Sequence, residues 1–271
     1  MVHKTYKCFV ILEKIKTMKI LLSPAKSIDI NVSATYYAYT FPVFHKQAQQ
    51  LASKLAKYAP KKIMELMDVS SQIADLNVER YQNFQLSETI AEWNKPAAFI
   101  FTGEVYRGLN MNNLDEKHYT SAQKNIRILS GLYGILKPFD LIYPYRLEMG
   151  TSWQITPKTK NLYAFWGDKV AKQLASEMET KEMIINLASN EYFKVLPKNS
   201  IKQRIITPVF KEFKGDKYST VMMYAKHARG AMARYIIENQ INEPEQLKLY
   251  NVDGYQYQEN LSSENEWFFT R

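Results

Sequence analysis

The sequence contains a single cysteine, Cys8, in 271 residues. One thiol cannot form an internal disulfide, and such sparse use of cysteine is typical of a reducing compartment, so we expect a cytoplasmic protein. The four histidines lie far apart, with none three or four positions from another. Zinc sites need clustered cysteine and histidine, and iron sites need clustered histidines, carboxylates or thiolates. We therefore expect no metal site and no cofactor.

Long hydrophobic runs and the common active-site motifs are also missing. No apolar run approaches the ~20 residues that span a bilayer, so we expect no membrane partner. The sequence has no GxxxxGK[ST], GxGxxG or GxSxG motif. The usual nucleotide-binding and hydrolase signatures therefore do not indicate a function.

Charge is abundant and mostly positive. The chain has 36 Lys and Arg against 27 Asp and Glu, a formal net charge of +9 at pH 7. Residues 190–235 alone hold ten basic and three acidic side chains, a local charge of +7. A basic excess favours a polyanion or an anionic metabolite as the partner.

A second methionine, Met18, follows seventeen residues whose longest apolar stretch has five members. That stretch is shorter than the ~7–15 residues of a signal-peptide core. We expect residues 1–17 to be a disordered or non-native N-terminal extension. No linker, repeat or low-complexity tract divides residues 18–271, which we expect to form a single domain.

Hydrophobic patterns predict both strands and helices. Short apolar runs predict buried strands at 19–22, 97–101, 126–129, 183–187 and 218–223. An edge strand is expected at 204–210, because Pro208 cannot donate to a ladder. Helical spacing predicts helices at 44–58, 60–67, 71–83, 163–178 and 224–239. The C-terminus predicts three further strands at 247–252, 254–258 and 266–270. The predicted class is α/β (mixed α+β), a compact body with a mixed sheet and surrounding helices.

Polar or glycine-bearing segments follow the first five predicted strands. Open sheets bind ligands outside the carboxyl ends of their strands. If these strands share one sheet, one cleft collects Lys26, Arg107, Tyr133, Ser189, Lys226 and Arg229. The alternative is that these are ordinary surface loops, which are commonly polar and glycine-rich.

Two smaller patterns point to ligand chemistry. Lys226, His227 and Arg229 fall in the first turns of the helix predicted at 224–239, where cations oppose the helix dipole. That arrangement favours an anion such as phosphate at the helix start, although a solvated basic face is the alternative. Arg146 and Glu148 are two residues apart and share a face if the segment is extended, so they form an ion pair or a binding pair.

Together the motifs resemble one family, the YaaA peroxide-stress-response proteins of bacteria. The matching stretches are LLSPAKSID (21–29), FTGEVYRGL (101–109), LSGLYGILKPFDLIYPYRLEMG (129–150), LYAFWGD (162–168), INLASNEYF (185–193), PVF (208–210) and YAKHARGAMARYIIEN (224–239). The resemblance implies a cytoplasmic, DNA-binding protein that helps limit unincorporated iron during hydrogen-peroxide stress. It also implies a basic cleft and a helix-hairpin-helix element, which here falls on residues 59–84. The hairpin lacks the usual glycine, so we expect Ser70 and Ser71 to cap its second helix. Both are also expected DNA- or anion-binding residues, and the alternative is an ordinary αα-hairpin packed on the core.

Two functions follow as hypotheses. The first is a DNA-binding stress protein without sequence preference, which holds double-stranded DNA or another phosphate-bearing ligand. Its expected contacts are Lys26, Arg107, Arg146, Lys226, Arg229 and Arg234. The alternative is an enzyme that acts on a nucleotide or nucleobase, in DNA or free, in a cleft built from strand-end loops. A walled pocket too narrow for a duplex favours the enzyme, and an open basic groove favours DNA binding.

Overall fold

Strand β1 (Met18–Leu22) lies between β3 (Ile126–Ser130) and β6 (Met183–Asn186) and pairs with both in parallel. The computed structural model describes residues 18–32, 39–85, 94–197 and 200–271. The expectation for residues 1–17, including Cys8, lies outside the described residues. All five residues of β1 are buried, as are all five of β3, so these strands are rich in apolar residues, although Lys19 and Arg127 are buried with them.

The main sheet has eight strands in the order β4-β3-β1-β6-β7-β10-β9, with β8 paired to β7 off this path. Its other strands are β4 (Gly134–Leu136), β7 (Ile205–Lys214), β8 (Lys217–Ser219), β9 (Gln256–Tyr257) and β10 (Glu266–Thr270). The strands from β3 to β10 are parallel, and β4, β8 and β9 pair antiparallel with their neighbours. The sheet is mixed, as expected. A separate two-stranded ladder joins β2 (Lys95–Pro96) to β5 (Leu141–Ile142).

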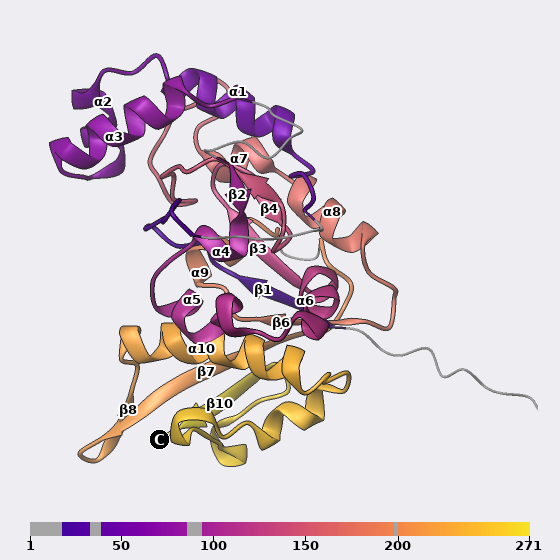
Figure 1. Ribbon diagram of the computed structural model, residues 1–271. Coiled ribbons are helices and arrows are strands. Elements are labelled where there is room, and N and C mark those ends of the chain that lie inside the picture. Colours follow the sequence, from indigo (N-terminus) through magenta and orange to yellow (C-terminus); the bar gives the residue numbers. More distant parts are fainter. Residues whose placement is uncertain (1–17, 33–38, 86–93, 198–199) are drawn as a thin grey trace, which may run out of the picture.

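Helices surround this sheet within one mixed α/β body (Figure 1). They are α1 (His45–Leu55), α2 (Pro60–Met67), α3 (Ser71–Gln82), α4 (Ala97–Ile100), α5 (Glu104–Leu109), α6 (Tyr119–Asn125), α7 (Leu162–Trp166), α8 (Lys169–Ser176), α9 (Asn190–Phe193) and α10 (Met222–Glu238). Helices α1 to α3 gather at the upper end of Figure 1, and α10 lies beside β7 near the lower end. Within the described residues, no helix combines the length and apolarity needed to cross a membrane.

Helices α5 and α10 cross at very short range through two glycines. A Cβ atom on Gly230 of α10 would lie 1.7 Å from the carbonyl oxygen of Val105 in α5. A Cβ on Gly108 of α5 would lie 2.2 Å from the carbonyl oxygen of His227. Only glycine permits this backbone contact. The small residues of α10 therefore serve helix packing at this point.

Strand β7 is not the edge strand that Pro208 suggested. It pairs with β6 through Ile205 and Ile206, and then with β10 from Thr207 onward. The amide of Thr207 donates to the carbonyl of Asn265 on the β10 side. Backbone groups alternate along a strand, so the nitrogen of Pro208 points away from β10, toward the side where β6 pairs. Pairing with β6 has ended by that point, and the amide that Pro208 lacks is not needed.

Two predicted strands are helical instead. The apolar run at 97–101 begins α4, which starts directly after Pro96, and such a short run does not distinguish a buried strand from a buried helix. The run at 247–252 falls in the 3-10 helix η3 (Pro244–Leu249) and the start of η4 (Val252–Gly254). Pro244 occupies the first turn of η3, where its missing amide costs no hydrogen bond.

Two further boundaries were wrong. The predicted strand at 218–223 ends at Ser219, and α10 begins at Met222. The predicted helix at 163–178 is two helices, α7 and α8, because Gly167 between them has φ of 53° and breaks the helical path.

Candidate functional site at the carboxyl ends of the parallel strands

The carboxyl ends of β1, β3 and β6 meet at one edge of the sheet, because the three strands are parallel neighbours. The chain continues from β1 to β3 on one side and later reaches β6 on the other, so β1 marks a topological switch point. Such points are where open α/β sheets form ligand crevices. Here the amide of Ser189, after β6, donates to Oγ of Ser23, after β1, at 2.9 Å. The hydroxyl of Tyr106 donates to the carbonyl oxygen of Ser23 at 3.1 Å.

A small recess, called the inner recess below, opens beside this junction. Its water-accessible volume is about 10 Å³, and it is lined by Pro24, Ala25, Lys26, Tyr145, Arg146, Leu147, Glu148 and Tyr192. One buried water needs about 10–15 Å³ of such volume, so the recess has room for about one water molecule. Lys26 and Arg146, two of the expected contacts, therefore lie together, with Ser189 just outside.

Glu148 contacts both basic side chains of the inner recess. Its Oε1 atom lies 3.0 Å from both Nε and Nη2 of Arg146 and 3.3 Å from Nζ of Lys26. The predicted ion pair between Arg146 and Glu148 is confirmed. The other oxygen, Oε2, is buried and accepts no hydrogen bond from the described residues. The Glu148 side chain is 14% exposed and that of Lys26 is 66% exposed, so the lysine forms part of the rim.

The tyrosines around the recess hold their hydroxyls in structural hydrogen bonds. The Tyr145 hydroxyl lies 2.6 Å from Oγ of Ser130, and the Tyr81 hydroxyl donates to the carbonyl oxygen of Arg146. Burial raises the pKa of Tyr145, Tyr81 and Tyr192 well above the usual value for a phenol. These groups are therefore neutral at physiological pH and are not available as bases.

Tyr133 lies behind the recess and does not line it. Its hydroxyl accepts the amide of Tyr143 at 3.0 Å, and its ring packs against Phe84 and Tyr145. Burial raises the pKa of its phenol as well. Tyr133 supports the segment that carries Arg146 and Glu148.

Three expected contacts, Arg107, Lys226 and Arg229, lie on α5 and α10 and are called the outer cations below. Arg107 is highly exposed and bridges to Glu104 at 2.8 Å. Lys226 is exposed, and neither it nor Arg229 has a hydrogen bond or ion pair with another described residue. Burial lowers the pKa of the Arg229 guanidinium, although arginine stays charged at any physiological pH.

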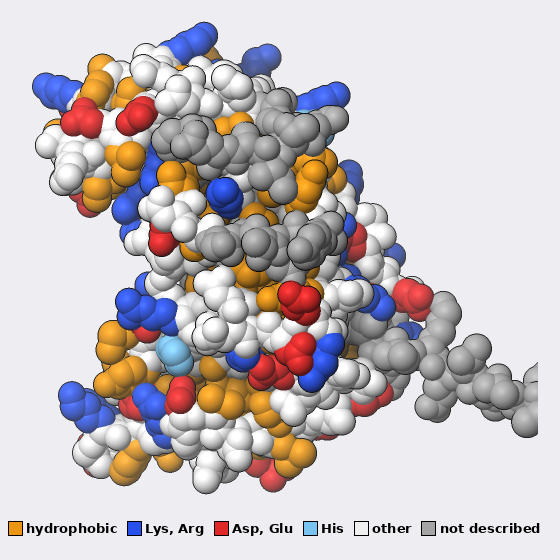
Figure 2. Space-filling view, in the orientation of Figure 1, with side chains coloured by type: hydrophobic (Ala, Val, Ile, Leu, Met, Phe, Trp, Pro, Cys, Tyr) orange, Lys and Arg blue, Asp and Glu red, His pale blue; other side chains and the backbone are white. Residues whose placement is uncertain are grey.

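The left flank of the molecule is hollowed between the end formed by α1 to α3 and the end where α10 and the β7–β8 hairpin lie (Figures 1 and 2). Lys and Arg side chains lie on both sides of this hollow (Figure 2). A His side chain, with acidic groups nearby, is also seen on the lower side. His227 on α10 lies 3.8 Å from Glu104 and 3.6 Å from Asp253. Carboxylates therefore accompany the outer cations.

The guanidinium of Arg234 is hydrogen-bonded to backbone carbonyl oxygens of a neighbouring segment. Its guanidinium donates to the carbonyl oxygens of Leu109, Asn110 and Asn113 and forms a 2.6 Å ion pair with Glu238. These carbonyls end α5 and the turn that follows, where no helical amide is available to them. The structure thus uses Arg234 to close α5 against α10.

The start of α10 differs from the expectation. The helix begins at Met222 with Val221 as N-cap, so Lys226 and Arg229 lie in its second and third turns. The dipole effect is confined to the first turn. The electrostatic conflict proposed for these two cations is therefore weaker than the sequence suggested.

Helices α2 and α3 pack against each other and are joined by Asp68, Val69 and Ser70. Ser70 caps α3 by accepting the amide of Ile73 at 3.4 Å, while Ser71 is the first helical residue. Asp68 ends α2 in the left-handed conformation, with φ of 49°, where a phosphate-gripping hairpin usually has glycine.

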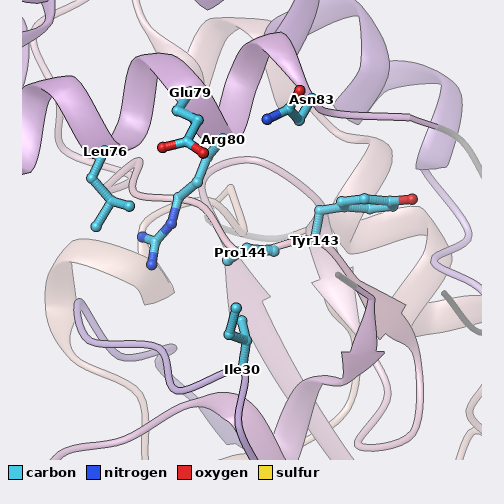
Figure 3. Close-up of a pocket in the computed structure, with 7 residues that line it drawn as sticks. All are labelled: Ile30, Leu76, Glu79, Arg80, Asn83, Tyr143 and Pro144. Atoms are coloured by element: carbon cyan, nitrogen blue, oxygen red, sulfur yellow. The ribbon is translucent and has the colours of Figure 1, made fainter. Parts of the chain in front are cut away.

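A second pocket lies between α3 and residues 143–144 (Figure 3). Its lining residues are Ile30, Leu76, Glu79, Arg80, Asn83, Tyr143 and Pro144. In Figure 3 the Arg80 guanidinium extends from α3 into the space between Leu76 and Pro144, and burial lowers its pKa. Sequence reasoning missed Arg80, because a lone arginine on an amphipathic helix carries no signal of its place in the fold.

Comparisons with known proteins agree on one family. A family model described as peroxide stress protein YaaA matches residues 18–261. A UPF0246 protein of Flavobacterium psychrophilum is 44% identical over 254 residues, covering 94% of this chain and all of that protein. The UPF0246 protein of Ralstonia pickettii is 44% identical over 256 residues, covering 94% of this chain and 99% of the relative. That of Polynucleobacter asymbioticus is 45% identical over 242 residues, covering 89% and 93%.

Proposed function

The chain belongs to the family of the peroxide stress protein YaaA, and on that premise we propose that it binds DNA and protects against hydrogen peroxide by helping to limit unincorporated iron. The family name supports the peroxide-stress role. Less free iron means less Fenton chemistry on DNA, and a protein that sits on DNA acts where that damage occurs.

The outer cations support the DNA-binding part of this proposal. Lys226 and Arg229 have no acidic partner among the described residues, so their charge is available to phosphate. They belong to the segment 190–235, whose local charge is +7. Lys and Arg bind any duplex through its phosphates, and this affinity weakens steeply with salt. The hollowed flank between α3 and α10 is the surface that best fits such a ligand (Figure 2).

The test is a salt titration of duplex binding, measured by fluorescence anisotropy on several unrelated sequences. We expect log K to fall linearly with log salt, by about 0.9 per phosphate neutralised, and to differ little between sequences. The double variant Lys226→Ala/Arg229→Ala should lose about two units of slope and most of its affinity. An affinity that is flat across salt would contradict the proposal.

The matched control is Lys124→Ala/Lys181→Ala. Both lysines are exposed, lie outside the segment 190–235 and precede β3 and β6, so they lie at the opposite edge of the parallel sheet. This variant removes the same net charge but should keep nearly the full affinity. The iron part is tested in a strain that lacks the gene. Paramagnetic resonance of whole cells should show more unincorporated iron under peroxide, and the intact gene should reverse the increase.

A second candidate function is an enzyme that acts on a nucleotide or nucleobase. The cluster of Lys26, Arg146 and Glu148 supports it, because these three charged groups meet at the carboxyl ends of the parallel strands. Several titratable groups that converge in a concave site are the usual starting point for an enzyme hypothesis. Incubation with nucleotides and with single-stranded DNA, followed by mass spectrometry of the products, tests for turnover.

A further inference from the structure

We propose that the pocket between α3 and residues 143–144 binds the phosphate at the end of a DNA strand, and that the Arg80 guanidinium is its main contact. This pocket is called the Arg80 pocket below. The inference rests on the DNA binding proposed above and adds a preference for strand ends, such as those at breaks, gaps and nicks. The outer cations do not supply such a preference, because Lys and Arg on an open surface bind any phosphate of the backbone.

The first observation is a guanidinium without a partner. The Arg80 side chain is partly buried, and it makes no hydrogen bond and no ion pair with any other described residue. By contrast, Arg127, Arg146 and Arg234 each form an ion pair with a glutamate. Removing water from a charged group with five N–H donors costs free energy unless another group replaces the water. An anion in the pocket supplies the missing partner.

The second observation is the size of the space that this guanidinium enters. Figure 3 shows the guanidinium between Leu76 and Pro144. The water-accessible volume of the pocket is about 70 Å³. At about 10–15 Å³ for each water, this volume holds about five to seven water molecules. A phosphate group, with one phosphorus and four oxygens, fits such a space, whereas a whole nucleotide is too large.

The third observation is the lining of the pocket. Ile30, Leu76 and Pro144 are apolar, and opposite charges attract each other more strongly beside such groups than in bulk water. Asn83 also lines the pocket, and its side-chain amide makes no hydrogen bond with any other described residue. The pocket thus offers a guanidinium, whose fork of donors matches the oxygens of a phosphate, and one further amide donor.

Glu79 is the only carboxylate among the described residues that line the Arg80 pocket. It is exposed and forms no ion pair with Arg80, so it is free to turn toward solvent when an anion enters. Its negative charge still opposes that anion. Removing the charge of Glu79 should therefore strengthen phosphate binding, whereas removing the charge of Arg80 should abolish it.

A strand end fits this pocket better than a phosphate inside a strand. A terminal phosphate is a monoester, which carries a charge of about −1.5 to −2 at pH 7 and three free oxygens. A phosphate inside a strand carries a single charge and has a sugar on each side. The pocket lies between α3 on one side and Ile30 with residues 143–144 on the other. A group with one substituent enters this space, and a group held between two sugars stays at its mouth.

The position of the pocket connects it with the proposed DNA surface. Arg80 lies on α3, which borders the hollowed flank, and α5 and α10 with the outer cations lie below that helix (Figures 1 and 2). The next residue, Tyr81, donates its hydroxyl to the carbonyl oxygen of Arg146, so α3 is fixed beside the inner recess. DNA that occupies the hollow therefore lies against α3, and a strand end there meets Arg80.

The experiment uses the full chain and stem-loop DNAs with a fluorophore in the loop, so that each duplex has one end. The end carries a 5′-phosphate, a 3′-phosphate or only hydroxyl groups, and a closed dumbbell of the same sequence has no end. Anisotropy titration gives each affinity, and the ratio between phosphate and hydroxyl ends is the end preference. Inorganic phosphate and a deoxynucleoside 5′-monophosphate, added as competitors, test whether the ligand is a free phosphate.

Four variants are compared with wild type. Arg80→Gln removes the guanidinium, and Glu79→Gln removes the opposing charge. Leu76→Trp narrows the pocket from an exposed position and leaves every charge in place. The matched control is Lys61→Gln, which removes an exposed cation of α2 that does not line the pocket.

We expect wild type to bind at least one phosphate end about tenfold tighter than the hydroxyl end, as for hydrogen bonds to a charged group. Arg80→Gln and Leu76→Trp should bring this ratio close to one, and Glu79→Gln should raise it. Lys61→Gln should keep the wild-type ratio. Because Arg80 has no hydrogen-bond or ion-pair partner among the described residues, its loss should not lower the melting temperature.

Four results would overturn the proposal. Equal affinity of wild type for phosphate ends, hydroxyl ends and the dumbbell would remove the end preference and leave the proposed DNA binding intact. An end preference that persists in Arg80→Gln and Leu76→Trp proteins that melt at the wild-type temperature would place the end site elsewhere. Competition by inorganic phosphate at the concentrations at which phosphate-ended DNA competes would identify a free anion as the ligand. Absence of binding to any DNA would overturn the proposed function together with this inference.

Discussion

Ser23 and Ser189 are hydrogen-bonded to each other although 166 positions separate them in the chain. The amide of Ser189 donates to Oγ of Ser23 at 2.9 Å, and the two hydroxyl oxygens are 3.3 Å apart. This contact ties the segment after β1 to the segment after β6. It sets the distance between the two chain segments that form one side of the inner recess.

Replacing Ser23 by Ala should lower the free energy of unfolding by about 1–3 kcal/mol, because the partly buried amide of Ser189 loses its acceptor. Urea denaturation followed by circular dichroism measures the change. The control is Ser53→Ala on α1, whose hydroxyl accepts an exposed hydrogen bond from Gln49. That variant should stay within about 0.5 kcal/mol of wild type. Equal losses in the two variants would mean that the Ser23 contact carries no special role.

Gly230→Ala should be among the most damaging single-methyl substitutions in the protein. The added Cβ would lie 1.7 Å from the carbonyl oxygen of Val105, so α5 and α10 must move apart. We expect a loss of about 2 kcal/mol or more, or failure to fold. Gly215→Ala is the comparison, because nothing lies within 4 Å of its Cβ position and only its φ of 68° opposes alanine. That strain alone costs about 1–2 kcal/mol. A thermal melt that places the two variants together would show that the helix crossing can relax.

Arg234→Ala and Lys226→Ala should act on different properties. Arg234 bonds three backbone carbonyls, so its loss should lower stability by about 1–3 kcal/mol. Lys226 is exposed and unpaired among the described residues, so its loss should leave the melting temperature nearly unchanged. It should instead reduce the salt slope of duplex binding by about one unit. A stable Arg234→Ala protein with strongly reduced DNA affinity would reassign this residue to the DNA contact.

The lowered pKa of Lys19 leads us to expect that the free energy of unfolding rises with pH. Its Nζ donates to the carbonyl oxygen of Lys124 at 2.7 Å. Burial, with help from the charge of Arg127, lowers its pKa to about 8, while Glu177 and Glu182 act in the opposite direction. The unfolded chain keeps the ordinary lysine pKa, so between about pH 8 and 10 it binds more protons than the folded chain. Folding stability therefore increases with pH across this window.

Urea denaturation at pH 7.5 and 9.5 measures this effect on wild type and on Lys19→Met. The advantage of wild type over the variant should grow by on the order of 1 kcal/mol between these values. The range stops below pH 10, because the buried tyrosines, whose pKa values are raised, destabilise the fold when they ionise in the unfolded chain. A constant difference between the two proteins would mean that Lys19 keeps its ordinary pKa when folded.

Much of the local structure followed from sequence patterns. The bounds of α2 and β10 were predicted as the structure has them, because amphipathic spacing and apolar runs act over a few residues. Short apolar runs were ambiguous, and the run at 97–101 became α4 because the local pattern is the same for a buried strand and a buried helix turn. Pro208 misled for a related reason. The missing amide of Pro208 is tolerated in β7 because pairing between β6 and β7 ends at Ile206. Where that pairing ends is set by strands that are distant in the chain.

By itself, the sequence determined the α/β class, the basic character, the resemblance to one family and the polar residues at strand ends. Only the tertiary structure decided which of those residues meet. It placed Lys26, Arg146 and Glu148 in one recess, left Lys226 and Arg229 on α10 without partners among the described residues, and committed Arg234 to backbone carbonyls. The reason is that strand order and helix crossing arise from contacts between distant segments, such as Gly230 against Val105. A basic side chain becomes a ligand contact or a structural one according to those contacts, and no local pattern records them.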